Sequence, residues 1–469
     1  MHQKKYQILA ALSATISEVS DGMQYGWSAP VTSLLLSPKS PVPVIESQIV
    51  WIETCLIIGT IIGIPLTIFL LETFGRKQAI LMATVQNLVA WILISVARSV
   101  GVIYCARILS GIAASVVFAA APVYVAEIAE KRIRGLLSSF FSLMMLGGVL
   151  LVYSVAPFVS IPLSSAVAAS FLVMQLVTLP FLPESPYYHI TKGNIEKARK
   201  CLQRLRSSDD VEIELEEIAG AIAKDVMARG RLTDIFTVRS NRLALLIIVV
   251  LNAAQHLGGI SVMLMNLHSI LEAAALWLSP NTVAIMFGGV MWLAALIGSQ
   301  FIDRFGRKPV LLFSAVTTGT VLILLAVYIT LQKRGYNVSQ YTWIPVILVL
   351  IYAASFRCGM GLIPIILTAE LFPSSVKSIG VSLSEASFTV VSCVAVFIYP
   401  YLETTLGSQG PFYIFGISCF LTSIFVAFVV PETKGKSLYE IQRLIKEKHN
   451  GETPLIDYGS IRSLNNNID

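Results

Sequence analysis

The chain has 469 residues, of which 55% are hydrophobic and only 13% are charged. Soluble domains carry about twice that share of charged residues, so this composition excludes an ordinary soluble globular protein. The net charge is +6, and the basic residues that produce it gather in short loops. No nucleic-acid-binding motif accompanies them. No metal-ligand spacing, nucleophile set or phosphate loop is present, so we expect no enzyme, no metal, no cofactor and no nucleic-acid partner.

The apolar stretches are roughly 20 residues long, which is the length of a helix that crosses a bilayer. Short alternating segments, which are typical of membrane barrels, are not found. The sequence therefore predicts an all-α integral membrane protein. We expect twelve spans, numbered in chain order, near residues 8–30, 48–71, 79–97, 101–123, 136–158, 163–182, 242–271, 281–302, 309–331, 342–368, 379–402 and 411–430.

The loops at 72–77, 130–134 and 303–308 are rich in Arg and Lys. The positive-inside rule puts these loops and both termini in the cytoplasm. The N-terminal Lys4 and Lys5 precede an apolar run with no small-residue cleavage site, so this run is expected to be a span rather than a removed signal peptide.

One motif occurs twice. Glu72-Thr73-Phe74-Gly75-Arg76-Lys77 matches Asp303-Arg304-Phe305-Gly306-Arg307-Lys308, and two further pairs repeat in the same order. Glu127 with Arg134 matches Glu370 with Lys377, and Pro183-Glu184 matches Pro431-Glu432. Three ordered matches predict two homologous six-helix bundles, at 1–183 and 242–431. Short amphipathic helices are expected between them at 184–241, on the cytoplasmic face, and a cytoplasmic tail at 432–469 that is disordered from about residue 450.

Polar residues recur every three to four positions along span one: Ser13, Ser17, Ser20, Asp21, Gln24 and Ser28, with Glu18 beside Asp21. Ionised groups this deep in a membrane normally face a cavity or a partner. One interpretation is a translocation path with a titrating carboxylate, which includes Glu18, Asp21, Gln24 and the Arg357 of span ten. The alternative is a salt bridge from the acids to Arg357, and the two stay open here.

Span seven carries a second stripe: Asn252, Gln255, His256, Gly259, Met263 and Asn266. Gly258-Gly259 weakens the helix in the middle of the span. Secondary transporters build substrate sites at such breaks, because freed backbone groups and polar side chains together replace water around a solute. His256 is expected to be a neutral, hydrogen-bonded side chain, with a proton relay as the alternative. In span ten, Gly359, Gly361 and Pro364 predict a hinge beside Arg357.

The charged residues of the loops and helix ends predict two gates. We expect Glu72, Arg76, Arg107, Glu127, Arg134 and Glu184 to lie together in the first half, and Asp303, Arg307, Glu370, Lys377 and Glu432 in the second. Simple topology signals would explain the positive charges but not the acids at matched positions. Networks that form in one state and break in the other can bias a two-state rocking equilibrium.

Several motifs resemble the sugar porter family of the major facilitator superfamily over nearly the whole chain. The matches are Gly-Arg-Lys at 75–77 and 306–308, Arg107 with Gly111, Glu127 with Arg134, Pro-Glu-Ser-Pro at 183–186, Gln255 with Gly259, Glu370-Leu371-Phe372-Pro373, and Pro-Glu-Thr-Lys-Gly at 431–435. The run from Gly26 to Pro30 looks most like an insect branch called facilitated trehalose transporters. The resemblance implies two bundles with a mid-membrane site between them, alternating access and cytoplasmic charge gates.

The chain departs from the family in the pocket. Ser142, His256, Ser261 and Ile365 stand where the resemblance implies Gln, Gln, Asn and Trp, and Met291 replaces a polar residue in span eight. The expected pocket is therefore Gln255, His256, Ser261, Ser142 and Asn266.

We expect a carrier for trehalose, a hexose or a polyol that sits in the plasma membrane as a monomer and is facilitative or proton-coupled. A non-transporting nutrient sensor is the alternative. The Asn337-Val338-Ser339 sequon is a possible glycosylation site.

Overall fold

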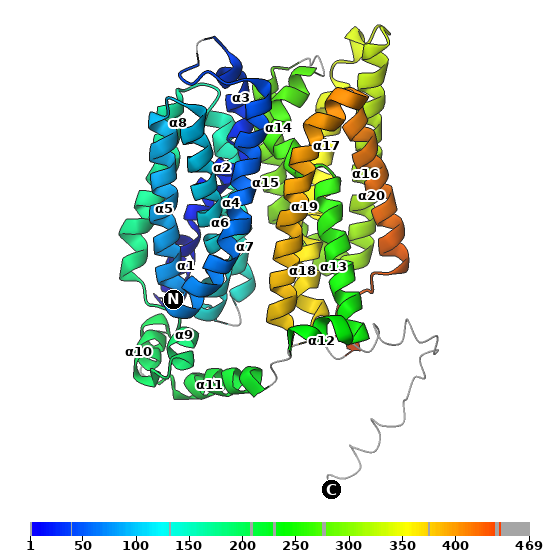
Figure 1. Cartoon of the computed structure of the whole chain (residues 1–469). Helices are drawn as coiled ribbons and strands as arrows, with labels where there is room; N and C mark the ends of the chain where they lie inside the picture. The colour runs from blue at the N-terminus through cyan, green and yellow to red at the C-terminus, as the bar shows by residue number, and fades with distance from the viewer. Residues whose placement is uncertain are drawn as a thin grey trace, which may run out of the picture.

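The structure is a computed structural model that describes residues 2–441 except 39, 131–132, 207–209, 228–230, 274–277, 374–375 and 437–439. All regular secondary structure in the described residues is helical. Figure 1 shows two bundles side by side, the N-terminal one in blue and cyan and the C-terminal one in green, yellow and orange. The expected disordered tail from residue 450 lies outside the described residues.

The N-terminal bundle contains eight α-helices and one short 3-10 helix. Its elements are α1 (His2–Thr15), α2 (Ser17–Gly26), α3 (Ser28–Leu36), α4 (Glu46–Thr73), α5 (Arg76–Val96), α6 (Val100–Ile128), α7 (Arg134–Val155), α8 (Ile161–Thr178) and η1 (Leu179–Phe181). Span one is divided because the chain bends at Ile16 and Trp27, although both residues keep right-handed helical dihedral angles. The three pieces α1–α3 follow one another from the bottom to the top of the bundle in Figure 1.

Four shorter helices connect the bundles: α9 (Pro186–Thr191), α10 (Ile195–Arg206), α11 (Glu212–Met227) and α12 (Leu232–Thr237). They lie below the bundles in Figure 1, at the end where the chain begins. The α9 helix starts with Pro186 in its first turn, and the Ser185 hydroxyl accepts a hydrogen bond from the Tyr188 N–H. The α10 helix packs one apolar side, with Ala198, Leu202 and Leu205, which is the helical spacing present in the sequence.

The C-terminal bundle consists of α13 (Arg239–Leu257), α14 (Ile260–Ala273), α15 (Pro280–Phe305), α16 (Arg307–Lys333), η2 (Ser339–Tyr341), α17 (Ile344–Cys358), α18 (Ile363–Leu371), α19 (Lys377–Leu406) and α20 (Gly410–Phe428). The break that Gly258-Gly259 predicts in span seven separates α13 from α14. The break predicted in span ten separates α17 from α18. Both breaks are confirmed.

Eleven helical segments of the described chain are long and apolar enough to cross a bilayer. Span one is not among them, because its pieces are 14, 10 and 9 residues long. The three pieces nevertheless run the height of the bundle between the other helices, so this segment completes the twelve that the sequence predicts. Polar side chains in span one are therefore inside a membrane bundle rather than on a surface helix.

The repeated motif forms the same structure twice. Gly75 and Gly306 adopt φ of +95° and +94°, a region that favours glycine, and each precedes a long helix. The Glu184 carboxylate accepts hydrogen bonds from the Lys77 N–H at 3.0 and 3.1 Å. Glu432 does the same for the first N–H groups of α16. A carboxylate at a helix N-terminus satisfies free N–H groups and the positive end of the dipole.

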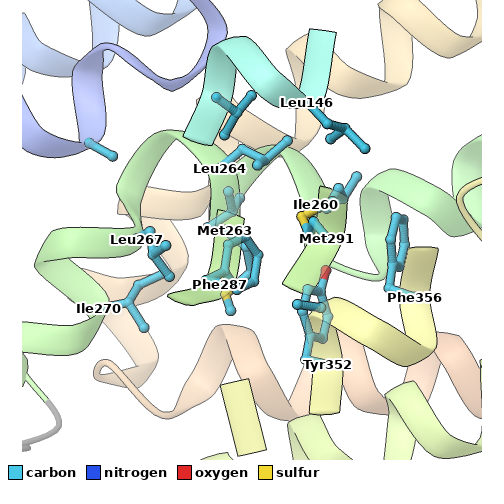
Figure 2. Packing of buried hydrophobic residues seen from close by; sticks show 14 of the residues in the cluster. Leu146, Ile260, Met263, Leu264, Leu267, Ile270, Phe287, Met291, Tyr352 and Phe356 are labelled. Carbon is cyan, nitrogen blue, oxygen red and sulfur yellow. The ribbon is translucent and has the colours of Figure 1, made fainter. Parts of the chain in front are cut away.

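The two bundles meet along four helix pairings: α7 with α15, α4 with α19, α14 with α2, and α14 with α3. Figure 2 shows the apolar packing at one of these seams, where Leu146 of α7 lies beside Leu264 of α14. Phe287 and Tyr352 of the same cluster stack on each other, with their ring centroids 6.4 Å apart. Met291, at a position where the resemblance implies a polar residue, is buried in this apolar cluster.

Candidate functional site

The break in span seven is fixed by the helices around it. Gly259 has φ of +85°, and a Cβ at this position would lie 2.8 Å from the Phe415 ring. The hydroxyls of Ser418 and Tyr352 donate to the Leu257 and Gly258 carbonyls at 2.9 and 2.8 Å. In this conformation each of these two carbonyls, freed by the break, already accepts a hydrogen bond from a side chain.

One hydroxyl gathers side chains from both bundles beside this break. The Ser261 Oγ lies 2.8 Å from His256 Nδ1, 2.9 Å from the Tyr25 hydroxyl and 3.0 Å from the Ser392 Oγ. The Phe388 ring packs edge-on against the His256 imidazole, with centroids 4.3 Å apart. The structure thus brings together the predicted residues His256 and Ser261. Tyr25 belongs to α2 of the other bundle, so the network joins the two halves.

Gln255 is buried one position before His256, and its side-chain NH2 has no hydrogen-bond partner among the described residues. A buried donor without a partner costs free energy, typically about 1–3 kcal/mol. The His256 Nε2 is likewise buried and unpartnered in the described part of the chain. These two nitrogens are the groups at the junction that a polar solute could satisfy.

Ser142 and Arg357 contact each other across the seam. The Arg357 Nη2 donates to the Ser142 Oγ, and its Nη1 donates to the Gly361 carbonyl at 3.4 Å. The Trp292 Nε1 donates to the neighbouring Leu143 carbonyl at 3.1 Å. The alternative in which Arg357 pairs with Glu18 or Asp21 is wrong, because no ion pair joins them and Arg357 bonds Ser142 instead.

Asn266 lies away from the central network. It interrupts α14 with non-helical dihedral angles, and its side chain donates to the Glu53 Oε2 of α4 at 3.2 Å. The interruption frees the carbonyls just before it, which accept hydrogen bonds from N-half hydroxyls. Ser28 donates to the Met265 carbonyl at 3.2 Å and Tyr153 to the Leu264 carbonyl at 2.6 Å. Asn266 therefore belongs to a set of bonds that closes the halves together at this end.

Arg107 does not lie with the predicted gate, which is a correction. Its Nη1 donates to the Gln24 carbonyl and side-chain oxygen at 2.6 and 2.8 Å, and its Nε donates to the Ile52 carbonyl at 3.2 Å. Arg107 and Glu127 are both on α6 but 20 residues apart, or about 30 Å along the helix. The arginine is fully buried near the start of α4, where it fastens α2 and α4 to α6.

The other gate residues form equivalent contacts in the two halves. Arg76 pairs with Glu127 at 2.9 Å, and Arg307 pairs with Glu370 at 3.1 Å. Glu184 and Glu432 are the helix-capping carboxylates of the two copies. Each ion pair lies within one half, so no described pair bridges the halves at this end.

Two predicted gate residues make no contact among the described residues. Glu72 and Lys377 are exposed, and no described hydrogen bond or ion pair involves them. The side chains of Arg134 and Asp303 lie outside the described part.

The chain matches the family described as "Sugar (and other) transporter" over residues 7–445. It belongs to this family. Among curated proteins, the transporter is 30% identical over 449 residues to the facilitated trehalose transporter Tret1 of Polypedilum vanderplanki, covering 93% of this chain and 87% of that one. It is 26% identical over 445 residues to the Tret1 of Bombyx mori, covering 93% and 86%.

Solved structures agree on the fold. The inward-open structure of the xylose transporter XylE from E. coli superposes with a TM-score of 0.77 at 21% identity, covering 94% of this transporter and 99% of XylE. A peptide transporter superposes with a TM-score of 0.64 at 12% identity, covering 92% and 95%. The expected major facilitator fold is therefore confirmed. Because the same fold occurs in a peptide transporter, the fold alone does not name the solute.

Sequence reasoning missed three residues of the junction at Ser261, namely Tyr25, Phe388 and Ser392, and also Glu53, the partner of Asn266. Glu53 carries a signal that could have found it, because it is a lone acid in the apolar run of span two. Tyr25, Phe388 and Ser392 carry none. Such residues are common inside membrane helices. The packing of α19 against α14 brings Phe388 and Ser392 to this network, and only Tyr25 needs the docking of the two bundles.

The span-one stripe is buried but points largely into its own bundle. Ser13 bonds Thr178 at 2.7 Å, the Trp91 Nε1 donates to Ser20 at 2.7 Å, and the Asn87 Nδ2 donates to the Asp21 Oδ1 at 2.6 Å. These contacts fix α2 and the end of α1 to α5 and α8. A water-lined path along this stripe stays a prediction without a described contact behind it, whereas its helix-packing role is plain.

Proposed function

We propose that this transporter moves a sugar-like solute, namely trehalose, a hexose or a polyol, across the plasma membrane by alternating access. The observation that carries the proposal is the Ser261 junction, where the His256 imidazole and hydroxyl groups from both halves meet beside a broken helix. The relatives called trehalose transporters support this solute class. The solute's own gradient is the expected driving force.

The chemistry of the junction suits a polyol. Gln255 offers two N–H donors, and His256 and the hydroxyls of Ser261, Ser392 and Tyr25 both donate and accept. The Phe388 ring supplies an apolar face against which a sugar ring can pack. Each neutral hydrogen bond contributes about 0.5–1.5 kcal/mol net, so four or five bonds are enough for millimolar to micromolar affinity.

Ser142 and Asn266 remain proposed pocket residues, but both have other partners in this conformation. A solute at Ser142 would need either to displace the Arg357 guanidinium or to form hydrogen bonds with Ser142 and Arg357 at the same time. Asn266 would need to leave Glu53 when the halves part. We propose that these two side chains contact the solute only in a state with a different arrangement of the seam.

Alternating access requires bonds between the halves that break in turn. The bonds at Leu264, Met265 and Asn266 join the halves at the end away from the N-terminus. At the opposite end, the ion pairs Arg76–Glu127 and Arg307–Glu370 each stay within one half. This pattern supports a state that is closed on the outside and open to the cytoplasm, with both termini on the cytoplasmic side.

A flux measurement tests the proposal. Oocytes that express the chain are given radiolabelled trehalose, glucose and sorbitol in turn, and surface protein is quantified in the same cells. We expect saturable uptake of at least one solute above that of water-injected cells. Surface protein with no flux of any of the three would overturn the proposal. In that case, a solute that still protects the protein thermally would favour the alternative, a nutrient sensor.

Two further proposals concern the outer face. Asn337 is exposed in the connection between α16 and α17, so we propose that its sequon is glycosylated. A glycosidase-sensitive mobility shift that Asn337→Gln abolishes would support the site and the orientation together. We propose that the protein is a monomer. The protein mass of the detergent-solubilised particle, measured after size-exclusion chromatography, tests this.

A further inference from the structure

The break in span ten places a positive charge in the seam between the two bundles. Arg357 lies in the last turn of α17, and its Nη2 donates to the Ser142 Oγ of the opposite half. Its Nη1 donates to the carbonyl of Gly361, inside the break, at 3.4 Å. The Nε is buried and has no hydrogen-bond partner among the described residues. Because a guanidinium has five N–H donors, this one keeps donors that neither neutral partner uses.

The chain around Arg357 is held in place on both sides. The Ser314 hydroxyl of α16 donates to the Ser355 carbonyl at 2.7 Å and accepts from the Met360 N–H at 2.9 Å. A Cβ on Gly359 would lie 2.3 Å from the Ser314 Cβ, so this close approach of α16 requires a glycine. The backbone that carries the guanidinium is therefore fixed by the fold.

No described acid compensates this charge. Glu370, the nearest acid along the chain, is paired with Arg307. Glu385 of α19 is exposed, and no described contact joins it to Arg357. The titratable neighbour of Arg357 is the Cys358 thiol, which is mostly uncharged at neutral pH. The seam thus contains a cation that has hydrogen bonds but no counter-charge in the described part of the chain.

The surroundings of this cation are apolar. Phe356 on one side of Arg357 and Met360 on the other belong to the buried apolar cluster, part of which Figure 2 shows. A charge in the interior of a membrane bundle is costly unless an opposite charge or water meets it, and such residues mark the routes of substrates. We propose that the solute supplies the missing charge, and that this transporter binds a sugar with one carboxylate, as in the uronic and aldonic acids.

A carboxylate fits this position better than a phosphate. The N–H groups of an arginine match the two oxygens of a carboxylate in a paired geometry. A phosphate group carries more than one negative charge at neutral pH, and Arg357 alone offsets only one. The carboxylate can also accept from the Ser142 hydroxyl, so that it contacts both halves of the transporter at once.

The break that holds Arg357 is in contact with the break beside the Ser261 junction. The Tyr352 hydroxyl of α17 donates to the Gly258 carbonyl at 2.8 Å. A Cβ on Gly258 would also lie 3.3 Å from the terminal methyl carbon of Met360. The two breaks therefore form one continuous region, in which a single solute can contact both.

This assignment rests on the proposed function and adds a charge to the solute. The hydroxyls of the sugar bind Gln255 and His256, whose buried nitrogens have no partner among the described residues. The carboxylate binds Arg357 and Ser142. A neutral sugar would fill the first set of groups and leave the guanidinium uncompensated, so it should bind more weakly.

Binding is tested with two probes that differ in one group. D-Glucuronate carries a carboxylate at carbon 6, where D-glucose carries CH2OH. The full chain is purified in detergent, and its melting temperature is measured against the concentration of each probe at constant ionic strength. We expect the half-saturating concentration of glucuronate to be at least about tenfold lower than that of glucose, which corresponds to about 1.4 kcal/mol. Equal half-saturating concentrations, or equal stabilisation by acetate, overturn the proposal.

Two variants place the preference at the arginine. Arg357→Gln removes the charge and should reduce the ratio of the two half-saturating concentrations to about one, a loss of about tenfold. Arg357→Lys keeps the charge but loses the paired N–H groups, and it should reduce the ratio by about threefold. The variants are measured separately, so that misfolding of one does not remove the test. Arg334→Gln, an exposed arginine after α16, is the matched control and keeps the full ratio. A full ratio in either Arg357 variant overturns the site.

Flux in oocytes separates this proposal from the proposed function. Glucose uptake that glucuronate inhibits no better than unlabelled glucose leaves the proposed function standing and removes the acidic group. Saturable glucuronate uptake that requires Arg357, without flux of trehalose, glucose or sorbitol, does the reverse. Stronger inhibition by glucose 6-phosphate than by glucuronate would show that the site selects a phosphate, which overturns the carboxylate.

Discussion

The two halves of this transporter are alike where they meet the loops and different in their interiors. At the loop end, each half has a glycine with positive φ, a capping glutamate and one arginine–glutamate ion pair. Inside, the N-terminal half holds Arg107 and the two acids Glu18 and Asp21, whereas the C-terminal half holds the hydroxyl and imidazole groups around Ser261. The charged contacts at the loop end are therefore duplicated, whereas the polar groups of the two interiors differ.

This difference follows from what each part must do. Gates must open and close in a symmetric rocking motion, so both copies need the same charges. A solute site needs groups that match one molecule, and a repeat of the same groups on both sides would not match an asymmetric solute. The following variants test this division, beginning with the largest expected effect.

Gly259→Ala should abolish most transport. The new Cβ would meet the Phe415 ring at 2.8 Å, and the φ of +85° is strained for any residue with a Cβ, at a cost of about 1–2 kcal/mol before the clash. We expect surface protein and flux to fall by about tenfold or more. Gly289→Ala is the matched control, because a Cβ there meets nothing within 4 Å. Normal flux in Gly259→Ala would show that the break at the solute site is dispensable.

Comparing Gln255→Ala with Gln24→Ala distinguishes a side chain that binds the solute from one that stabilises the fold. Both glutamines are buried, but only Gln24 has a strong partner, the Arg107 guanidinium. Loss of the Gln255 amide should raise the apparent KM about tenfold, corresponding to about 1.4 kcal/mol, with unchanged surface protein. Loss of the Gln24 side chain should instead lower surface protein and leave KM within about twofold. The reverse outcome would place solute recognition in the N-terminal half.

Glu127→Gln and Glu370→Gln should act alike. Each removes the charge from one ion pair within a half, at 2.9 and 3.1 Å, and each should shift the balance of open states. We expect turnover to fall about threefold to tenfold in both, while KM changes by less than about twofold. Equilibrium binding of the solute, measured beside flux, checks the assignment. A collapse of affinity in one variant only would mean that its half does not function as a gate.

Much of this architecture was predictable, because the repeat and the helical length of the spans are local properties of the sequence. The contacts Arg76–Glu127 and Arg307–Glu370 follow from matched spacings in the two halves. The break at Gly259 follows from a glycine pair in the middle of a span. Each of these depends on residues whose neighbours are fixed by one bundle.

The predictions that were wrong depend on the level in the bundle at which a helix places each residue, and on which helices it meets there. Arg107 was assigned to the gate because its motif occurs beside gate motifs in the sequence, but α6 carries it to the far end of the bundle. One of the two interpretations left open for Arg357 paired it with an acid of span one, whereas it bonds Ser142 of the opposite half. Tyr25 reaches Ser261 only through the docking of the two bundles, and Ser392 only through the packing of α19 against α14. No local spacing encodes either contact, so neither residue could be found from the sequence.

Tyr153→Phe should shift the transporter modestly toward the state that is open at the α14 end. It removes the hydroxyl that donates to the Leu264 carbonyl at 2.6 Å, a bond worth about 0.5–1.5 kcal/mol. The ratio of open states should change about twofold to tenfold, which distance measurements between spin labels on α3 and α14 can detect. Tyr328→Phe is the control, because the hydroxyl of that buried tyrosine has no partner among the described residues. Equal distance distributions in the two variants would exclude the Tyr153 bond as a latch.

Glu432→Gln should have the smallest effect, and it should depend on pH. Partial burial raises the pKa of Glu432, but the backbone N–H groups of Lys434, Lys308, Arg307 and Thr433 outweigh it and hold the pKa below its ordinary value. Because the pKa is depressed in the folded state, this stabilisation is fully present above the unfolded pKa of about 4.3 and is lost as the pH falls through the folded value. We expect the variant to melt slightly below the wild type at neutral pH and to converge with it in strong acid. If the difference in melting temperature between the variant and the wild type stays constant across the acid range, the charge on Glu432 contributes nothing. The cap at α16 would then act by neutral hydrogen bonding alone.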